Sequence, residues 1–219
     1  MARTAIAKKV NKKEGTSMRG TKWGEALTPE EQYHLRREVL FRTAAQAFNE
    51  SGFYTTTLDD IARRLNVSKP TLYYYVTSKE DILLECTRLA FAHMKDAIQE
   101  VQESKSDGIE KLTHFLEVYI ELVANDFGRC LIRTGLRPLT ESSRAKLLPV
   151  ARQINRALQD IIRAGVEEGS IRKCEPRTVA NAIFGSFNSV ALWHRESGDL
   201  TPARIAKDYI DLFIRGLRP

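Results

Sequence analysis

The chain has 219 residues, of which 42% are hydrophobic and 28% are charged, and its formal net charge is +6. This length and composition can bury a core in one small and one larger domain, and they exclude a chain that is disordered throughout. No run approaches the ~18 apolar residues of a membrane-spanning helix, and the N-terminus lacks the apolar core of a signal peptide. We therefore expect a cytoplasmic protein with no membrane partner.

The N-terminal segment, residues 1–27, is basic and of low hydrophobicity. Its first 22 residues carry seven Lys or Arg and a single acidic residue, Glu14, an excess equal to the net charge of the whole chain. Such a segment cannot fold without a partner. We expect either a disordered arm that follows DNA phosphates or enters a minor groove, or a solvating leader with no defined contact.

The first predicted helix begins after this arm. Thr28 is a suitable N-cap, and Pro29 and two Glu follow it in the first turn, where negative charge opposes the positive end of the helix dipole. The helix runs to about Ser51, and Gly52 ends it.

Residues 57–80, TLDDIARRLNVSKPTLYYYVTSKE, predict two short helices joined by a tight turn. After the N-cap Thr57, apolar residues recur at the spacing of one helix face: Leu58, Ile61, Ala62 and Leu65. Asn66 tolerates the left-handed conformation that the turn needs, and Val67 would fill the space under it. Ser68 would cap the next helix.

The second of these helices, about Lys69 to Tyr75, has a composition suited to a DNA groove. Leu72 and Val76 are its only aliphatic anchors, and the remaining side chains can bond phosphates or reach base edges. A rod of about 12 Å fits a major groove about 12 Å wide. Three consecutive tyrosines point in three directions, which argues against the alternative of an aromatic core helix.

The segments FNESGFYTTTLDDIARRL and VSKPTLYYYVTSKEDIL closely resemble the DNA-binding domain of the TetR family of bacterial transcriptional repressors. The resemblance covers about Leu35 to Leu84. It implies an all-α protein with a three-helix helix-turn-helix domain, residues 28–77, and a helical bundle, residues 78–219, that binds a small effector and dimerises. The residues expected to contact a double-stranded operator are Thr57, Ser68, Lys69, Thr71, Tyr73, Tyr74 and Lys79.

Within that set, Lys69 and Thr71 would lie nearest the base edges, and Thr57, Tyr74 and Lys79 would contact phosphates. Lys79 also begins a long helix, capped by Ser78, that continues to about Val101. This helix would connect the DNA site mechanically to the larger domain.

The remainder of the chain predicts further helices, at about Gly108–Asn125, Arg129–Gly135, Glu141–Glu168, Arg177–Glu196 and Pro202–Leu217. By the family resemblance, the last two would form a four-helix interface with a second subunit of a homodimer. The expected interface residues are Phe187, Ala191, Ile205, Tyr209, Leu212 and Phe213.

Residues 188–202 and the segment IAKDYIDLFIRGL are similar to the C-terminal signature of a TetR subgroup that senses acyl-coenzyme A thioesters. Arg129, Arg133 and Arg137 would align on a continuous helix to bind ligand phosphates, unless they form a solvated face. The candidate effector contacts are Phe91, Tyr119, Arg133, Phe184, Asn188 and Trp193. The alternatives are a plain hydrophobic or aromatic effector, and a purely structural core role for the apolar members.

Nothing in the sequence indicates an enzyme, a metal or a cofactor. The four His lie in no metal-ligand pattern, and no nucleophile elbow, dinucleotide or phosphate-loop motif is present. Cys86, Cys130 and Cys174 are far apart and odd in number, which favours buried free thiols. A helical binding protein without DNA would leave the composition of the Lys69–Tyr75 helix unexplained.

Overall fold

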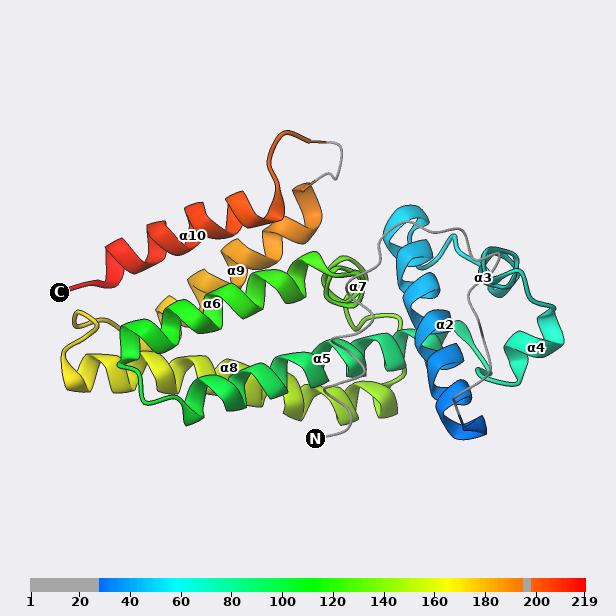
Figure 1. The fold of residues 1–219 in the computed structure, drawn as a ribbon, viewed down its shortest axis with the longest axis horizontal. Coiled ribbons are helices and arrows are strands. Elements are labelled where there is room, and N and C mark those ends of the chain that lie inside the picture. Colours follow the sequence, from blue (N-terminus) through cyan, green and yellow to red (C-terminus); the bar gives the residue numbers. More distant parts are fainter. Residues whose placement is uncertain (1–27, 195–197) are drawn as a thin grey trace. The chain divides into compact units, whose positions relative to one another are not determined.

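The computed structural model describes residues 28–194 and 198–219, and every regular element in these ranges is a helix (Figure 1). The elements are α2 (Pro29–Ser51), α3 (Leu58–Leu65), α4 (Lys69–Tyr73), α5 (Lys79–Glu103), α6 (Gly108–Ala124), α7 (Asp126–Thr134), α8 (Glu141–Glu168), α9 (Pro176–Trp193) and α10 (Pro202–Leu217). The expected all-α class is confirmed. None of these helices is both long enough and apolar enough to cross a membrane.

The chain divides into two parts, residues 1–36 and 37–219, and the boundary falls within α2. The basic arm, residues 1–27, lies outside the described residues. In the first part, the Thr28 hydroxyl accepts a hydrogen bond from the N–H of Glu31 at 3.2 Å, and the Glu31 carboxylate accepts one from the N–H of Thr28 at 2.7 Å. The expected cap is confirmed, and the expected domain boundary at residues 77 and 78 stays a prediction.

Local signals fix α3 and α4. The Thr57 hydroxyl accepts from the N–H of Asp60 at 3.1 Å, and the Asp60 carboxylate accepts from the N–H of Thr57 at 3.0 Å, which forms a capping box. Asn66 ends α3 in the left-handed conformation, with φ of 55°. The Ser68 hydroxyl accepts from the N–H of Thr71 at 3.3 Å and starts α4. All three features agree with the sequence expectation.

Two details of this region differ from that expectation. α4 ends at Tyr73 instead of Tyr75, because the N–H of Tyr75 bonds the Leu72 carbonyl at 2.9 Å and tightens the last turn. The Val67 side chain is exposed and does not fill the space under the turn. Its backbone closes the turn instead, since the N–H of Val67 donates to the Ala62 carbonyl at 3.0 Å.

In the second part, α5, α6 and α8 lie side by side, and α9 and α10 pack on α6 (Figure 1). Small residues allow α6 and α8 to approach closely: a Cβ added to Gly108 would lie 2.3 Å from the Cα of Gly165. Cys86 and Cys130 are buried in this core and Cys174 is half-buried, and all three are free thiols.

The predicted arginine stripe is interrupted. Asn125 caps α7, accepting from the N–H of Gly128 at 2.9 Å, and the helix ends before Gly135, which has φ of 66°. Arg137 therefore lies outside the helix that holds Arg129 and Arg133, and the three do not share one helical face. The reason is the glycine, which can adopt a conformation that ends the helix.

Two sets of hydrogen bonds connect the helix-turn-helix region to the later helices. The Gln46 amide donates to the Asp126 carboxylate at 3.0 Å, and the Asn49 amide donates to the Asp126 carbonyl at 3.0 Å, joining α2 to the start of α7. The Glu80 carboxylate accepts from the N–H of Thr140 at 2.9 Å and the hydroxyl of Ser143 at 3.1 Å, joining α5 to the start of α8. In addition to the expected connection through α5, α7 thus provides a second connection between the helix-turn-helix region and the later helices.

Candidate DNA interface and effector region

The outward face of α4 carries hydroxyl and phenol groups above a buried aliphatic base. Leu72 and Val76 are buried, whereas Tyr73 is 50% exposed and Tyr74 is 74% exposed. Thr71 is exposed beside them. The helix is therefore anchored by two aliphatic side chains and directs hydrogen-bonding groups outward, as groove recognition requires.

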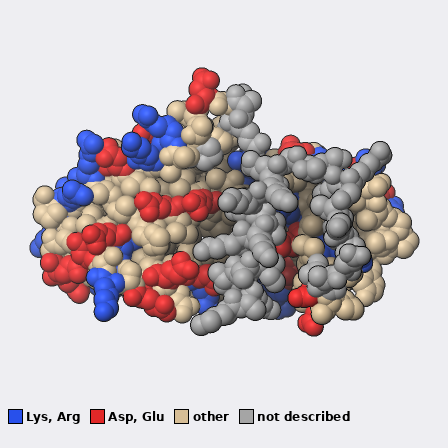
Figure 2. Space-filling model, viewed as in Figure 1, with Lys and Arg blue, Asp and Glu red and all other residues tan. Residues whose placement is uncertain are grey.

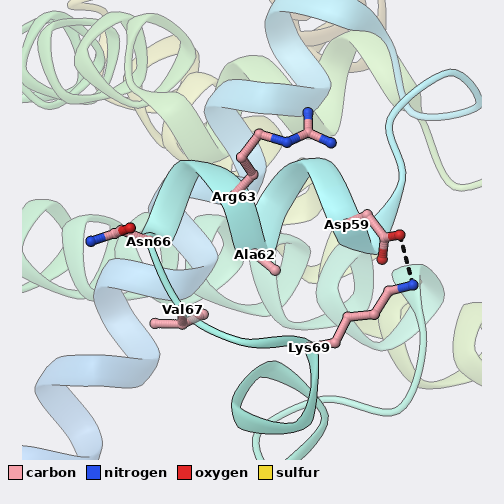
Figure 3. Close-up of a pocket in the computed structure, with 6 residues that line it drawn as sticks. All are labelled: Asp59, Ala62, Arg63, Asn66, Val67 and Lys69. Atoms are coloured by element: carbon pink, nitrogen blue, oxygen red, sulfur yellow. Dashed lines mark ion pairs between the residues drawn. The ribbon is translucent and has the colours of Figure 1, made fainter.

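Lys69, at the start of α4, is held by a carboxylate of α3. Its ammonium nitrogen lies 2.6 Å from a carboxylate oxygen of Asp59, and this hydrogen bond raises the pKa of Lys69 above its ordinary value. Figure 3 shows the two side chains pointing toward each other at one end of an open hollow of ≈ 470 Å³. The hollow is lined by Asp59, Ala62, Arg63, Asn66, Val67 and Lys69. The sequence reasoning did not single out Asp59, because nothing local links it to a residue ten positions later.

Lys79 is bonded to backbone carbonyls of its own chain, which the sequence did not predict, and the phosphate contact expected for it stays a prediction. Its ammonium donates to the carbonyls of Thr56 at 2.7 Å, Phe53 at 2.8 Å and Tyr54 at 3.3 Å, and it lies 4.8 Å from the centre of the Phe53 ring. These three carbonyls can use all three N–H donors of a lysine. The side chain therefore holds the loop between α2 and α3 in place.

That loop presents an exposed residue that the sequence reasoning missed. Tyr54 is highly exposed, and it directly precedes the Thr residues that lead to the capping residue Thr57. An aromatic residue between Gly52 and a run of Thr was the only available signal. The hydroxyls of Thr57 and Ser68 act as caps, so both lie fixed at the starts of α3 and α4.

Three of the expected effector contacts meet between α6 and α9. The Tyr119 hydroxyl donates to the Asn188 side-chain oxygen at 2.5 Å, and the Phe184 ring lies edge-on to the Tyr119 ring at 5.2 Å. The Phe115 ring stacks on the Tyr119 ring at 5.8 Å and lies edge-on to the Phe184 ring at 6.3 Å. Burial raises the pKa of Tyr119, so its phenol stays a neutral donor at physiological pH. We call these four residues the Tyr119 cluster.

The other expected contacts lie elsewhere. Arg133 is exposed on α7 and donates to the Ala191 carbonyl of α9 at 3.3 Å. Trp193, at the end of α9, is exposed and donates to the Ser189 hydroxyl at 3.3 Å. Phe91 is half-buried on α5 against the core. The candidates are thus divided among the Tyr119 cluster, the far end of α9 and, for Phe91, α5.

A groove of ≈ 310 Å³ between α5 and α8 was also not expected. Its apolar floor is edged by charged and amide side chains, and its lining is Lys95, Ile98, Gln102, Pro149, Val150, Gln153, Ile154, Arg156, Ala157 and Asp160. These residues come from two helices about 50 positions apart, so no local sequence pattern links them, and Pro149 lies inside α8.

Several of the residues expected at a dimer interface on α9 and α10 are buried within the single chain, and the interface itself stays a prediction. Phe187, Ala191 and Ile205 are buried inside their own chain, so they offer no surface to a second subunit. Tyr209 and Phe213 are half-buried and contact the Phe187 ring at 5.5 Å and 6.0 Å. The reason is that the apolar stripes of both helices are used first within the subunit.

The outer sides of these helices provide other candidates. Leu212 is 69% exposed on α10 and Leu192 is exposed on α9. A Cβ added to Gly185 or Gly216 would meet no atom within 4 Å, so a second backbone could approach closely at both positions. Figure 2 shows Lys and Arg gathered over α10, and acidic residues over α5 and α6.

Comparisons with known proteins place these features in a family. Residues 40–86 match the family described as bacterial regulatory proteins, tetR family, and residues 105–217 match the family described as tetracyclin repressor-like, C-terminal domain. The chain is 22% identical over 181 residues to the fatty acid metabolism regulator protein of Bacillus subtilis (strain 168), which covers 81% of this chain and 93% of that protein.

Solved structures have the same fold. The TetR family transcriptional regulator PfmR from Thermus thermophilus is similar with a TM-score of 0.74 and 29% identity, over 82% of this chain and 99% of that one. AibR, solved in complex with isovaleryl coenzyme A and operator DNA, is similar with a TM-score of 0.72 and 21% identity. The similarity to AibR covers 81% of this chain and 97% of that one, and it shows the fold alone.

Proposed function

Because the chain belongs to the TetR family of bacterial transcriptional regulators, whose members are not enzymes, we propose that it is a ligand-responsive repressor. It binds a palindromic operator as a homodimer and is released by a small effector. The observation that carries this proposal is the outward face of α4, where exposed Thr71, Tyr73 and Tyr74 stand on the buried anchors Leu72 and Val76. A helix that only packs would not expose these side chains together.

The contacts with DNA follow from the placement of each side chain. Lys69 and Thr71 lie at the exposed start of α4 and read base edges, and Tyr73 extends this surface. Thr57, Ser68 and Tyr74 contact phosphates, which sets the register of the protein on the duplex. Lys79 contributes indirectly, because its ammonium fixes the loop that carries Tyr54.

Dimerisation is proposed because α4 is too short to contact many bases. α4 has five residues and makes too few base contacts for specific binding at ~10⁻⁸ M, whereas two copies across a palindrome double them. The exposed faces of α9 and α10 supply the interface, with Leu192 and Leu212 as apolar contacts and Gly185 and Gly216 at points of close approach.

The proposed effector is an acyl-coenzyme A thioester. The name of the Bacillus subtilis relative refers to fatty acid metabolism, and AibR was solved with isovaleryl coenzyme A. In this chain, the Tyr119 cluster combines aromatic rings with one polar pair, a composition suited to an acyl group, and the Arg133 guanidinium is exposed for phosphates. The second candidate is a plain hydrophobic or aromatic compound, favoured by the aromatic character of the cluster.

Binding to DNA is tested by a gel-shift titration with the DNA upstream of the protein's own gene and a scrambled duplex of the same composition. We expect a dissociation constant of about 10⁻⁸ M or tighter for the upstream DNA, and binding at least about 10³-fold weaker for the scrambled duplex. Equal affinity for the two duplexes would reject an operator in that region.

The effector is tested by isothermal titration with a panel of acyl-coenzyme A esters, the matching free acids and free coenzyme A. We expect the esters to bind and to release DNA, and free coenzyme A to bind more weakly because it lacks the acyl group. Tight binding of the free acids, with inert esters, would reject the thioester and leave the repressor proposal intact.

A further inference from the structure

Asp59 has no role in the contacts proposed above, yet its side chain lies at the surface that would face DNA. It is in the first turn of α3, and its partner Lys69 is the first residue of α4. The two side chains are 47% and 55% exposed, so each still presents part of its polar group to the open hollow (Figure 3).

A carboxylate at this place weakens general attraction to DNA, because the phosphates carry the same charge. Within the protein, Asp59 is stabilised by the positive end of the α3 dipole and by Lys69. Close to DNA, a carboxylate is favourable opposite a hydrogen-bond donor of a base. In the major groove such donors are the amino groups of cytosine N4 and adenine N6. Asp59 accepts one bond from Lys69, and its carboxylate retains further acceptor sites for a base amino group.

Lys69 retains donors in the same way. An ammonium has three N–H groups, and the bond to Asp59 uses one of them. The two others match the two adjacent acceptors of guanine, N7 and O6, whereas adenine offers only N7 beside a donor. In a G·C pair, the cytosine N4 donor lies next to guanine O6, since these two groups are paired with each other.

The geometry points to a composite base reader, in which Lys69 and Asp59 together recognise one G·C base pair in each operator half-site. The ammonium donates to guanine N7 and O6, and the carboxylate accepts from cytosine N4. The inference rests on the proposed operator binding and specifies which base pair the start of α4 reads. In this structure the neighbouring cation Arg63 is bonded to Asp60, at 3.0 Å, whereas Asp59 is bonded to Lys69.

The test is a selection from a randomised duplex library, read by sequencing, with the full-length wild type, Asp59→Ala and Lys69→Ala. The wild type should enrich sites with one fixed G·C pair per half-site that both variants lose, each by about tenfold or more in relative affinity. Because the two side chains act as one unit, removing both should cost no more selectivity at that base pair than removing either one alone.

Binding to scrambled DNA distinguishes the effect of each residue on general attraction to DNA from its effect on base recognition. Asp59→Ala should bind scrambled DNA more tightly than the wild type, since Lys69 becomes free to contact a phosphate, and its salt slope should rise by ~1 per subunit. Lys69→Ala should bind scrambled DNA more weakly. If Asp59 had only a structural role, Asp59→Ala would weaken binding to all DNA sequences alike.

Glu50→Gln is the matched control, because it removes another exposed carboxylate that pairs with an arginine, Arg64, at 2.7 Å on the neighbouring part of the fold. Its base preferences should equal those of the wild type. Thermal unfolding establishes that each variant is folded, and Asp59→Asn, which keeps the shape of the side chain, replaces Asp59→Ala if that variant is unfolded.

Three outcomes would overturn the inference. Asp59→Ala or Asp59→Asn could retain every base preference, the two single variants could lose preference at different base pairs, or the shared pair could be A·T. In all three the wild type still selects an operator, so the proposed function stands. A wild type that enriches no sequence would overturn the operator proposal and this inference with it.

Discussion

The Lys79 ammonium and the caps of α3 and α4 hold the reading surface in shape before DNA binds. Three carbonyls of the loop between α2 and α3 converge on that ammonium. Thr57 and Ser68 fix the first turns of α3 and α4 by hydrogen bonds to backbone N–H groups. Groups that are already ordered lose less conformational freedom on binding, so this local order favours affinity.

Replacing Lys79 by Ala should therefore lower stability and weaken binding to all DNA sequences alike. Loss of hydrogen bonds to partly buried carbonyls should destabilise the fold by about 1–3 kcal/mol. We expect the salt slope of DNA binding to stay unchanged, because the ammonium donors are used by three backbone carbonyls. Thermal unfolding and anisotropy titrations at several salt concentrations measure both effects, with Lys105→Ala, an exposed lysine of the loop between α5 and α6, as the control. Unchanged stability together with a slope lower by ~1 would instead assign Lys79 to a phosphate.

Glu80 makes the link between α5 and α8 sensitive to pH. Hydrogen bonds from Thr140, and then from Ser143, hold the pKa of Glu80 below its ordinary value of 4.5. A carboxylate whose pKa is lower in the folded state than in the unfolded state stabilises the fold at pH values above the unfolded-state pKa. This contribution is lost as the pH falls through the folded-state pKa. The melting temperature of Glu80→Gln should thus lie below that of the wild type at pH 7, and the difference should shrink below pH 4.5. If the difference in melting temperature between Glu80→Gln and the wild type is the same at pH 7 and below pH 4.5, the hydrogen bonds of Glu80 do not depend on the charge of its carboxylate.

At the scale of elements, α7 connects the candidate effector region to the helix-turn-helix. Its first residue, Asp126, accepts hydrogen bonds from Gln46 and Asn49 of α2. Near its other end, Arg133 bonds the α9 carbonyl of Ala191. We therefore expect a ligand that moves α9 relative to α6 to act on α2 through this short helix, in addition to the path along α5.

Removing this connection should uncouple effector binding from DNA release. In Gln46→Ala, the acyl-coenzyme A ester that releases the wild type from DNA should bind with its usual affinity but release DNA less completely. The coupling free energy, typically about 1–3 kcal/mol, should fall by a measurable part. Isothermal titration with and without operator DNA gives this quantity, and Gln99→Ala, on an exposed face of α5, is the control. Full coupling both in Gln46→Ala and in a variant that also carries Asn49→Ala, which removes the second bond to Asp126, would leave α5 as the sole connection.

The elements themselves could largely be predicted from the sequence, because their boundaries depend on local chemistry. Thr57, Asn66 and Ser68 act through residues at most four positions away, and α8 and α10 have the predicted bounds. The pairing of Asp59 with Lys69 and the carbonyls around Lys79 depend on tertiary approach, which no local pattern encodes. For the same reason, hydrophobic spacing on α9 and α10 did not distinguish Phe187, which packs inside the chain, from Leu212, which is exposed.

At the scale of the whole molecule, the proposed dimer should depend on the outer face of α10. Leu212→Glu places a charge in the interface but leaves the subunit core intact, because Leu212 is 69% exposed in the single chain. We expect a folded monomer in analytical ultracentrifugation, with operator affinity reduced by at least about a hundredfold. Leu148→Glu, an exposed leucine of α8, should remain a dimer. If Leu212→Glu also stays a dimer, the interface lies on another face.

The exposed start of α4 is proposed to read an operator, and the most direct test of this role is one affinity comparison. Operator and scrambled duplexes are titrated with the wild type and with a Lys69→Ala, Thr71→Val variant that has been shown to be folded and dimeric. We expect the variant to lose about 2 kcal/mol or more of binding free energy per subunit for the operator. Its loss of binding free energy for scrambled DNA should be much smaller. A variant that discriminates between the two duplexes as well as the wild type would contradict the proposed reading role of α4.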